Sequence, residues 1–244
     1  MSGAEPPAAP EPPADAPDSV RALPPPARDA LTRIVALLAA ERSAPSSVRE
    51  PPDAWRVHVA DSLAGLGFAE LASAGRIADV GAGAGFPGLV LAAALPDAHV
   101  DLVESIERKC EFMRRAIAES GIANAGIVCA RSEDLAAAGA AGREAYDAVT
   151  VRAVGRLSTL AELASPLLHY GGVLVAWKGH RDPDEEAELA RAAAELAIEP
   201  VEVRHAGPYA GSRHRHLHLM RKAGPTPSNL PRRPGVAKKR PLGS

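Results

Sequence analysis

The chain is poor in cysteine and in aromatic residues. Its two cysteines, Cys110 and Cys129, each stand alone among apolar neighbours. This argues against a disulfide framework and leaves too few ligands for a structural zinc site. We therefore expect both cysteines to be reduced core residues and expect no metal. Aromatic side chains make up only 3% of the sequence, which excludes extended base-stacking platforms.

Long apolar segments and a leader are also missing. The longest apolar runs, such as 34–40 and 89–95, are far shorter than the roughly 20 residues that a membrane span needs. No basic stretch followed by an apolar one opens the chain, so no secretory signal is visible. We expect a cytoplasmic protein that does not contact membranes.

Acidic residues are absent from the C-terminal part of the chain. Ten Lys and Arg and no Asp or Glu lie between 204 and 244, which leaves 18 basic and 30 acidic residues before that point. An acidic body with a basic end favours a polyanionic partner that the C-terminal part contacts. A solubilising tail is the alternative.

The composition divides the chain into three parts. Residues 1–26 contain nine prolines and little that could be buried, so we expect them to be disordered. Residues 27–222 are predicted to form one folded domain, with N-terminal helices within 27–67 that include an amphipathic helix over 27–42 and a second that begins near Asp53. Residues 223–244 form a basic, proline-rich arm that we expect to be extended.

From residue 76 the pattern is that of a parallel sheet with helical crossovers. Short β-like apolar runs alternate with amphipathic segments, which is typical of an α/β fold. The predicted strands are 76–80, 99–103, 126–130, 146–151 and 172–177, and the predicted helices are 87–95, 106–120, 157–168 and 183–197. Two further runs, 201–204 and 214–220, predict a terminal antiparallel hairpin.

A glycine run follows the first predicted strand. Gly81, Gly83 and Gly85 alternate before Phe86 and let the backbone turn tightly against a ligand. The run also satisfies the G-x-G-x-x-G dinucleotide pattern, so an NAD(P)-dependent oxidoreductase has to be considered.

Two residues disfavour a dinucleotide at this loop. Pro87 removes an amide that would hold the pyrophosphate, and Asp79 would place a negative charge beside it. S-adenosylmethionine, which carries an ammonium and a sulfonium, suits an acidic strand end better.

The next two strands also end in polar residues. Glu104 follows the second strand, where a carboxylate can accept both ribose hydroxyls. Arg131, Ser132 and Glu133 follow the third strand, where an adenine ring can lie between a backbone amide and an acid. Carboxyl ends of consecutive parallel strands meet at one edge, so these pieces predict one ligand site.

Cations end the fourth and fifth predicted strands. Arg152, within Val151-Arg152-Ala153, and Lys178 would flank the position where a substrate meets the cofactor, which implies an anionic substrate such as RNA. The spacing supports no nucleophilic triad or carboxylate pair, so hydrolysis has no positive support. His214, His216 and His218 would share one face of a strand, which we expect to be polar rather than metal-binding.

Together these segments resemble one family, the 16S ribosomal RNA guanine-N7 methyltransferases, also called glucose-inhibited division protein B. The segments are DVGAGAGFPG at 79–88, LVES at 102–105, RSE at 131–133, YDAVTVRA at 146–153, GGVLVAWKG at 171–179 and HVADSL at 58–63. The resemblance covers residues 50 to 242. It implies a seven-stranded class I S-adenosylmethionine-dependent methyltransferase fold, Rossmann-like, preceded by N-terminal helices. It also implies methylation of N7 of one guanine in a conserved 16S rRNA loop near the decoding region.

The resemblance and the strand ends together give the expected site. Arg152 and Lys178 are the expected catalytic residues, and the expected partner is 16S rRNA or the small ribosomal subunit, bound by a monomer. The expected cofactor contacts are Asp79, Gly81, Gly83, Gly85, Phe86, Glu104, Ser132, Glu133 and Arg152. The expected RNA contacts are His58, Arg131, Lys178, Arg213, Arg215, Arg232, Arg233, Lys238 and Lys239.

The chain departs from the family pattern near its N-terminus. The usual Trp-Asn pair and Asn-Leu-Thr turn are not found between 27 and 52, and Val57 stands where an Arg usually precedes the His. A non-enzymatic RNA-binding module remains the alternative from another class.

Overall fold

A computed structural model describes residues 10–41, 43–152 and 155–244, so the expected disorder of 1–9 and the role of Ala153 lie outside it. The helices are α1 (Asp18–Arg21), α2 (Pro25–Ala40), α3 (Pro51–Ala54), a π-helix (Trp55–Ala60), α4 (Asp61–Leu63), a 3₁₀ helix (Ala64–Gly67), α5 (Ala69–Ala72), α6 (Gly88–Ala94), α7 (Glu107–Ser120), α8 (Ser132–Leu135), α9 (Leu157–Ala164), α10 (Pro183–Ala192) and α11 (Val236–Lys239). The strands are β1 (Arg76–Val80), β2 (His99–Glu104), β3 (Ala125–Cys129), β4 (Tyr146–Arg152), β5 (Leu168–Lys178), β6 (Ile198–His205) and β7 (His216–Lys222).

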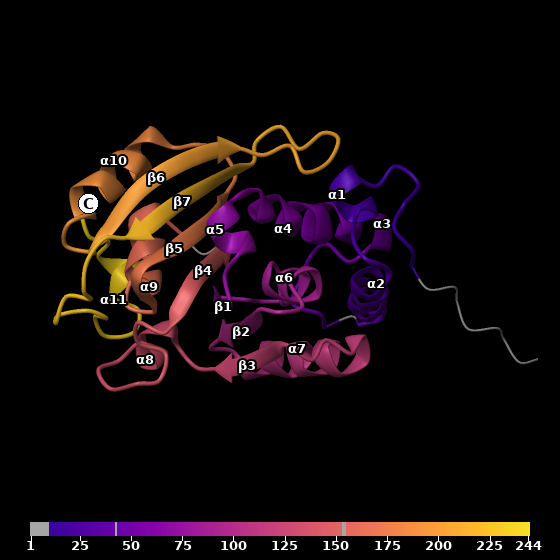
Figure 1. Cartoon of the computed structure of the whole chain (residues 1–244), viewed down its shortest axis with the longest axis horizontal. Helices are drawn as coiled ribbons and strands as arrows, with labels where there is room; N and C mark the ends of the chain where they lie inside the picture. The colour runs from indigo at the N-terminus through magenta and orange to yellow at the C-terminus, as the bar shows by residue number, and fades with distance from the viewer. Residues whose placement is uncertain (1–9, 42, 153–154) are drawn as a thin grey trace, which may run out of the picture.

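The strands form one seven-stranded sheet in the order β3-β2-β1-β4-β5-β7-β6 (Figure 1). β1 to β5 pair in parallel, and β7 is antiparallel to both β5 and β6. Successive residues of a strand point to opposite faces, so Ile77 packs in one core cluster and Ala78 in the other. The expected seven-stranded α/β fold with a terminal hairpin is confirmed.

Each face of the sheet is covered by helices. The first core cluster takes residues such as Leu31 of α2 and Phe112 of α7, and the second takes Leu160 of α9 and Leu189 of α10. Hydrophobic burial on both faces explains why the parallel strands are almost continuously apolar. No helix in the described part of the chain is long and apolar enough to cross a membrane.

Residues 10–26 pack against the domain, so the expectation of disorder is wrong for this part of the N-terminal segment. Val20 and Leu23 are buried in the first core cluster, and the Trp55 indole donates a hydrogen bond to the Pro10 carbonyl at 2.8 Å. α1 packs against the π-helix, a contact that the proline content of the segment does not reveal.

The helix predicted near Asp53 is divided into several short pieces. The chain winds as a π-helix over Trp55–Ala60 before it returns to α-helical and then 3₁₀ geometry. π-helical turns are rare and often occur at functional sites.

The expectation of two reduced cysteines is also wrong. Cys110 of α7 and Cys129 at the end of β3 form a disulfide, with their Cα atoms 6.0 Å apart. The sheet register places Cys129 beside Glu104, and α7 returns antiparallel over this edge, so the fold joins two positions that the sequence separates by 19 residues.

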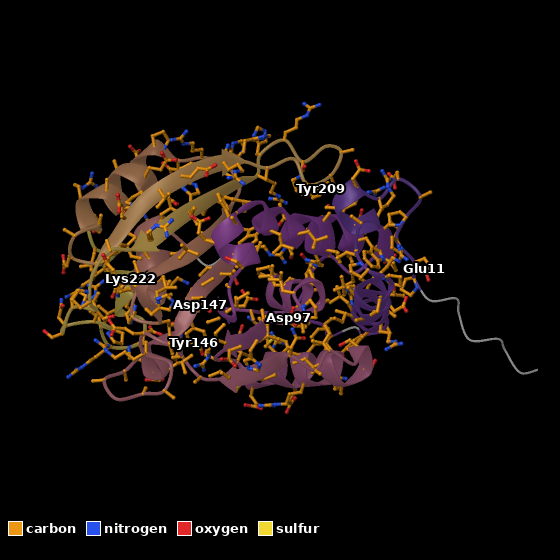
Figure 2. All side chains as sticks on the ribbon, in the orientation of Figure 1. Glu11, Asp97, Tyr146, Asp147, Tyr209 and Lys222 are labelled. Carbon is orange, nitrogen blue, oxygen red and sulfur yellow. A yellow bond between two sulfur atoms is a disulfide. The ribbon has the colours of Figure 1, made fainter. Side chains whose placement is uncertain are left out.

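The segment after β7 packs against the domain. Lys222 lies near the end of β7 (Figure 2), where its ammonium donates hydrogen bonds to the Ser165 carbonyl at 2.7 Å and to the Thr226 hydroxyl at 2.9 Å. Burial lowers the pKa of Lys222 to about 8. Leu230 is buried in the second core cluster, so the expectation of an extended arm is wrong.

Candidate methyl-donor and RNA site

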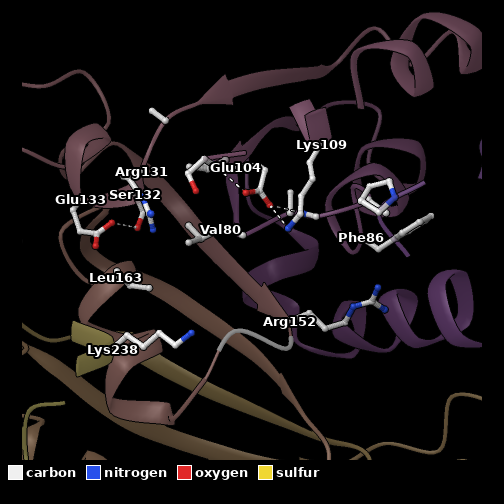
Figure 3. A pocket seen from close by; sticks show the side chains of 18 of the residues that line it. Val80, Phe86, Glu104, Lys109, Arg131, Ser132, Glu133, Arg152, Leu163 and Lys238 are labelled. Atoms are coloured by element: carbon white, nitrogen blue, oxygen red, sulfur yellow. Dashed lines mark hydrogen bonds and ion pairs between the residues drawn. The ribbon is translucent and has the colours of Figure 1, made fainter. Parts of the chain in front are cut away.

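A cavity of about 480 Å³ lies at the carboxyl ends of the central strands (Figure 3). β1 and β4 are neighbours here, and the strand order reverses between them, which is where open α/β sheets bind ligands. The predicted site residues that line the cavity are His58, Gly81, Gly83, Phe86, Glu104, Arg131, Ser132, Glu133, Arg152 and Lys238.

The glycine loop places backbone atoms against this cavity. The Gly81 amide donates to the Val103 carbonyl at 2.8 Å, and the Gly83 amide donates to the Glu104 carboxylate at 3.2 Å. Gly81 and Gly83 have φ angles of +72° and +62°, a region that residues with a Cβ rarely adopt. The turn therefore requires glycine at both positions.

Gly85 serves packing rather than the ligand. A Cβ built on it would lie 2.4 Å from Cδ1 of Leu89, and its backbone lies outside the described lining of the cavity. The third glycine is needed so that α6 can approach the loop closely. The expected cofactor contact of Gly85 is corrected accordingly.

Asp79 lies beneath the loop, which corrects its expected contact with the cofactor. Its Oδ2 accepts a hydrogen bond from the Gly88 amide at 2.8 Å, and its Oδ1 accepts one from the Thr150 hydroxyl at 3.1 Å. Burial raises the pKa of Asp79 to about 6, although both hydrogen bonds oppose the shift. The side chain therefore holds the start of α6 against β4.

The Glu104 carboxylate is fixed at the end of β2. One oxygen accepts hydrogen bonds from the amides of Ser105 and Ile106 at 2.8 and 3.0 Å, and the other accepts from Gly83. The Lys109 ammonium lies 3.2 Å from the second oxygen. Backbone donors therefore hold one carboxylate in a single orientation at the cavity wall.

Ser132 and Glu133 begin α8 and are both buried. The Ser132 hydroxyl donates to one Glu133 oxygen at 3.3 Å, and the Gly235 amide donates to the other at 2.9 Å. A second acidic acceptor thus faces the cavity, on the side away from Phe86 in Figure 3.

Arg152 ends β4 and holds His58 in one protonation state. Its guanidinium donates to Nδ1 of His58 at 3.1 Å, to the Val57 carbonyl at 3.1 Å and to the Asp61 carboxylate at 3.2 Å. Arginine always carries its protons, so Nδ1 accepts and the proton of a neutral imidazole is on Nε2, 3.1 Å from the Val48 carbonyl.

The His58 ring also forms part of an aromatic wall. It stacks on Phe86 with the ring centroids 4.5 Å apart and the planes 7° from parallel. Burial, with the Arg152 charge, lowers the pKa of His58 to about 4. His58 is 7% exposed and lines the cavity, so it forms part of the cavity wall, and its expected contact with RNA stays a prediction.

Asp61 joins Arg152 to the hairpin of β6 and β7. Its carboxylate lies 3.2 Å from Arg152 and 3.4 Å from Arg215, whose side chain also contacts the Tyr209 hydroxyl. Burial raises the pKa of Asp61, although both cations oppose the shift. The Arg215 side chain is still 37% exposed, so its expected contact with RNA stays a prediction.

Lys178 is not among the residues that line the cavity. Its ammonium donates to the Gly155 carbonyl at 2.8 Å and pairs with the Glu185 carboxylate at 2.8 Å. Neither partner lines the cavity, so a direct role in catalysis or RNA contact is not supported.

Only two of the three histidines expected on one strand face lie on it, because His216 and His218 share a face of β7 and His214 lies outside the strand. His214 precedes β7 and stacks on His180, and His216 lies edge-on to His205. His218 is buried, and burial lowers its pKa to about 4. The expected polar face is therefore wrong for His218.

The remaining expected RNA contacts differ in exposure. Arg131, Arg213, Arg233, Lys238 and Lys239 are exposed. Arg232 instead makes a two-pronged ion pair with Glu162 of α9, whose side chain is buried. Arg232 is thus a structural contact and not the expected RNA contact.

Several residues that line the cavity were not predicted from the sequence. Those outside the predicted strand-end segments are Pro45, Ser46, Lys109, Thr159, Leu163, Gly235 and Ala237. Lys109 lies five residues after Glu104, in the first turn of α7, so its closeness in sequence could have indicated it. The others come from segments distant in sequence, which carry no local signal.

The comparisons with known proteins agree with this geometry. The family model GidB, described as rRNA small subunit methyltransferase G, matches residues 33–217. The chain is 41% identical to ribosomal RNA small subunit methyltransferase G of Rubrobacter xylanophilus over 80% of this chain and 75% of that one. It is 38% identical to the Deinococcus radiodurans protein of the same name over 89% and 86%.

Solved structures show the same fold. A predicted O-methyltransferase from Agrobacterium tumefaciens matches 68% of this chain and 81% of its own at 26% identity, with a TM-score of 0.50. A fibrillarin pre-rRNA processing protein of Methanococcus jannaschii matches 68% of this chain and 74% of its own at 17% identity, with a TM-score of 0.52.

Proposed function

The chain belongs to the GidB family, rRNA small subunit methyltransferase G, and from this premise we propose how the cavity performs the reaction. The enzyme uses S-adenosylmethionine and acts on small-subunit rRNA. We assign the methylated atom to N7 of one guanine in a conserved loop of 16S rRNA near the decoding region. We further propose that the enzyme works as a monomer in the cytoplasm.

The observation that carries the proposal is the convergence of four strand ends on one cavity. The loop after β1 brings glycine backbone to the cavity, β2 ends in the acceptor Glu104, Glu133 follows β3, and β4 ends in Arg152. Ribose hydroxyls and the adenine amine are hydrogen-bond donors, so two oriented carboxylates match an adenosyl group. The residues present therefore fit S-adenosylmethionine.

Within this site the residues have separate roles. Gly81, Gly83 and Phe86 would hold the amino-acid end of the donor, Glu104 would hold its ribose, and Ser132 with Glu133 would hold its adenine. Bound there, S-adenosylmethionine supplies a methyl group activated by a positive sulfur. Arg152 lies beside Phe86, with its guanidinium 5.9 Å from the ring centroid, and would position the guanine nucleotide.

The site does not need a general base. Neutral guanine carries a lone pair on N7, so no proton has to leave before transfer. His58 is the neutral imidazole at the wall, and its Nδ1 already accepts from Arg152. Catalysis would then rest on alignment, which can contribute about 7–11 kcal/mol, and the network of Arg152, His58 and Asp61 supplies a rigid wall for it.

The exposed cations would contact the flanking RNA. Arg131 and Lys238 lie at the cavity, and Arg213, Arg233 and Lys239 are exposed elsewhere on the described surface. Phosphate contacts of this kind hold RNA without reading its sequence. Specificity would therefore depend on the shape of the loop that presents the guanine.

Calorimetry and methylation mapping test the proposal. We expect S-adenosylhomocysteine to bind and NADH not to bind. We also expect 16S rRNA from a strain without the gene to lack one N7-methylguanine, restored by the wild-type chain. Binding of NADH alone would indicate an oxidoreductase, and RNA binding without S-adenosylhomocysteine binding would indicate a non-enzymatic RNA-binding module.

A further inference from the structure

The C-terminal segment of residues 232–239, here called the strap, crosses the second face of the domain and ends at the cavity. It contains α11, and its residues Gly235, Ala237 and Lys238 line the cavity together with Leu163 of α9. Figure 3 shows Lys238 below Leu163, on the side of the cavity where Ser132 and Glu133 lie. Ala237 is 3% exposed, so the strap is packed and not a free tail.

Two contacts with α9 hold the strap in place. Arg232 donates two hydrogen bonds to the Glu162 carboxylate, one at 2.6 Å. One turn earlier on α9, the Thr159 hydroxyl donates to the Ala237 carbonyl at 3.3 Å. A two-pronged arginine–carboxylate pair fixes orientation as well as distance, so Arg232 anchors the start of the strap.

The strap in turn orients Glu133. The Gly235 amide donates to Oε1 of Glu133 at 2.9 Å, across 102 residues of sequence, and the Ser132 hydroxyl donates to Oε2. An ionised carboxylate only accepts hydrogen bonds. With both oxygens held by donors, the group presents its remaining lone pairs in fixed directions.

We infer that the strap is part of the methyl-donor site: it closes the adenine side of the cavity and positions Glu133 for the adenine amine. This inference rests on the proposed function, because it assigns the ligand of Glu133 as the adenosyl group. It also gives the basic C-terminal segment a role in donor binding that is separate from its charge.

Calorimetry with S-adenosylhomocysteine on full-length variants tests the inference. Arg232→Gln removes the anchor and should weaken binding at least 10-fold, the size expected when a charge-assisted hydrogen bond no longer orders a site. Arg240→Gln removes an equal charge from an exposed side chain directly after the strap and should change the dissociation constant less than twofold. Equal affinities for the two variants would overturn the inference.

Hydrogen exchange on the wild-type chain keeps the test independent of whether Arg232→Gln folds. Saturating S-adenosylhomocysteine should slow amide exchange in a peptide over 232–240 at least fivefold and leave a peptide over α10 unchanged. If the protein binds the ligand but amide exchange in the 232–240 peptide does not change, the inferred role of the strap is overturned and the proposed function is not. A wild-type chain that does not bind the ligand would overturn the proposed function as well.

Discussion

Arg152 donates a hydrogen bond to Nδ1 of His58 over 3.1 Å, and this contact joins the end of β4 to the π-helix. Neither partner can exchange roles, because the guanidinium only donates and a protonated imidazole could not accept. Phe86 covers the other face of the imidazole. The neutral histidine is therefore a fixed part of the wall that carries Arg152.

The first prediction concerns the pH dependence of stability. The folded-state pKa of His58 is about 4, below its ordinary 6.5, so its contribution to stability is present above pH 6.5 and is lost as the pH falls through 4. Between pH 7.5 and 4.5 this amounts to roughly 2–3 kcal/mol. Over this pH range the free energy of unfolding should therefore decrease by roughly 2–3 kcal/mol less in His58→Asn than in the wild type. Urea unfolding of both proteins at the two pH values measures it, and equal decreases would contradict the assignment.

Asp79 should behave in the opposite sense. Its folded-state pKa is raised from 3.8 to about 6, so its contribution to stability is fully present below pH 3.8 and is lost as the pH rises through 6. The destabilisation by Asp79→Asn should therefore be roughly 2–3 kcal/mol larger at pH 4 than at pH 8. Thermal or urea unfolding at these values gives the difference. A destabilisation that grows with pH would show that the ionised form is the one the fold stabilises.

Loss of Arg152 should stop catalysis without unfolding the chain. Arg152→Ala removes three hydrogen bonds and the positioning charge, and we expect methyl transfer to small ribosomal subunits to fall at least about 100-fold, as misalignment in an active site commonly costs. Arg152→Lys should not restore it, because an ammonium cannot reproduce the fork. Arg114→Ala, on the exposed face of α7, is the matched control. Transfer of a radiolabelled methyl group measures the rates, and near-normal turnover of Arg152→Ala would remove the residue from the site.

A comparison of variants at Glu104 and Glu107 distinguishes an effect on cofactor binding from an effect of surface charge. Glu104→Gln places an amide where four hydrogen-bond donors converge and should weaken S-adenosylhomocysteine binding by roughly 10- to 100-fold. Glu107→Gln makes the same change at an exposed position of α7 and should leave the affinity within about twofold. Calorimetry at one pH and salt concentration compares them. Similar affinities would show that Glu104 only stabilises the loop.

The exposed cations should contribute to RNA affinity through salt release. The double variant Arg233→Gln with Lys239→Gln should weaken RNA binding at low salt and reduce the slope of log K against log salt by about 1.5. Binding isotherms with a 16S rRNA fragment at several potassium chloride concentrations give the slope. A slope equal to that of the wild type would mean that neither side chain meets a phosphate.

The sheet and the strand-end residues could be predicted because both depend on local pattern. Glu104, Ser132 and Glu133 follow apolar runs directly, and the ends of parallel strands converge whatever the connections are. The expected cofactor contact of Asp79 was wrong because the local pattern does not show the direction of its side chain. It lies two residues before Gly81, on the strand itself, and its side chain points beneath the loop toward Thr150.

The rest depends on contacts between distant segments. Arg232 lies 70 residues from Glu162, and the proline-rich sequence around it has no periodicity that could reveal the pairing. Lys178 and Arg152 both end a strand, so the sequence predicts the same role for both. The difference lies in the ion pair of Lys178 with Glu185, which belongs to α10. The π-helix gives no sequence signal, since the side chains around His58 suit an ordinary helix equally well.

The ladder between β1 and β4 has a consequence for the RNA. Val80 pairs with Val151, so adjacent backbones set the spacing between the glycine loop and Arg152, and buried strands allow it little variation. A base stacked within an A-form duplex cannot enter such a fixed gap. It follows that the guanine has to reach the cavity unstacked, as a base in a loop can be.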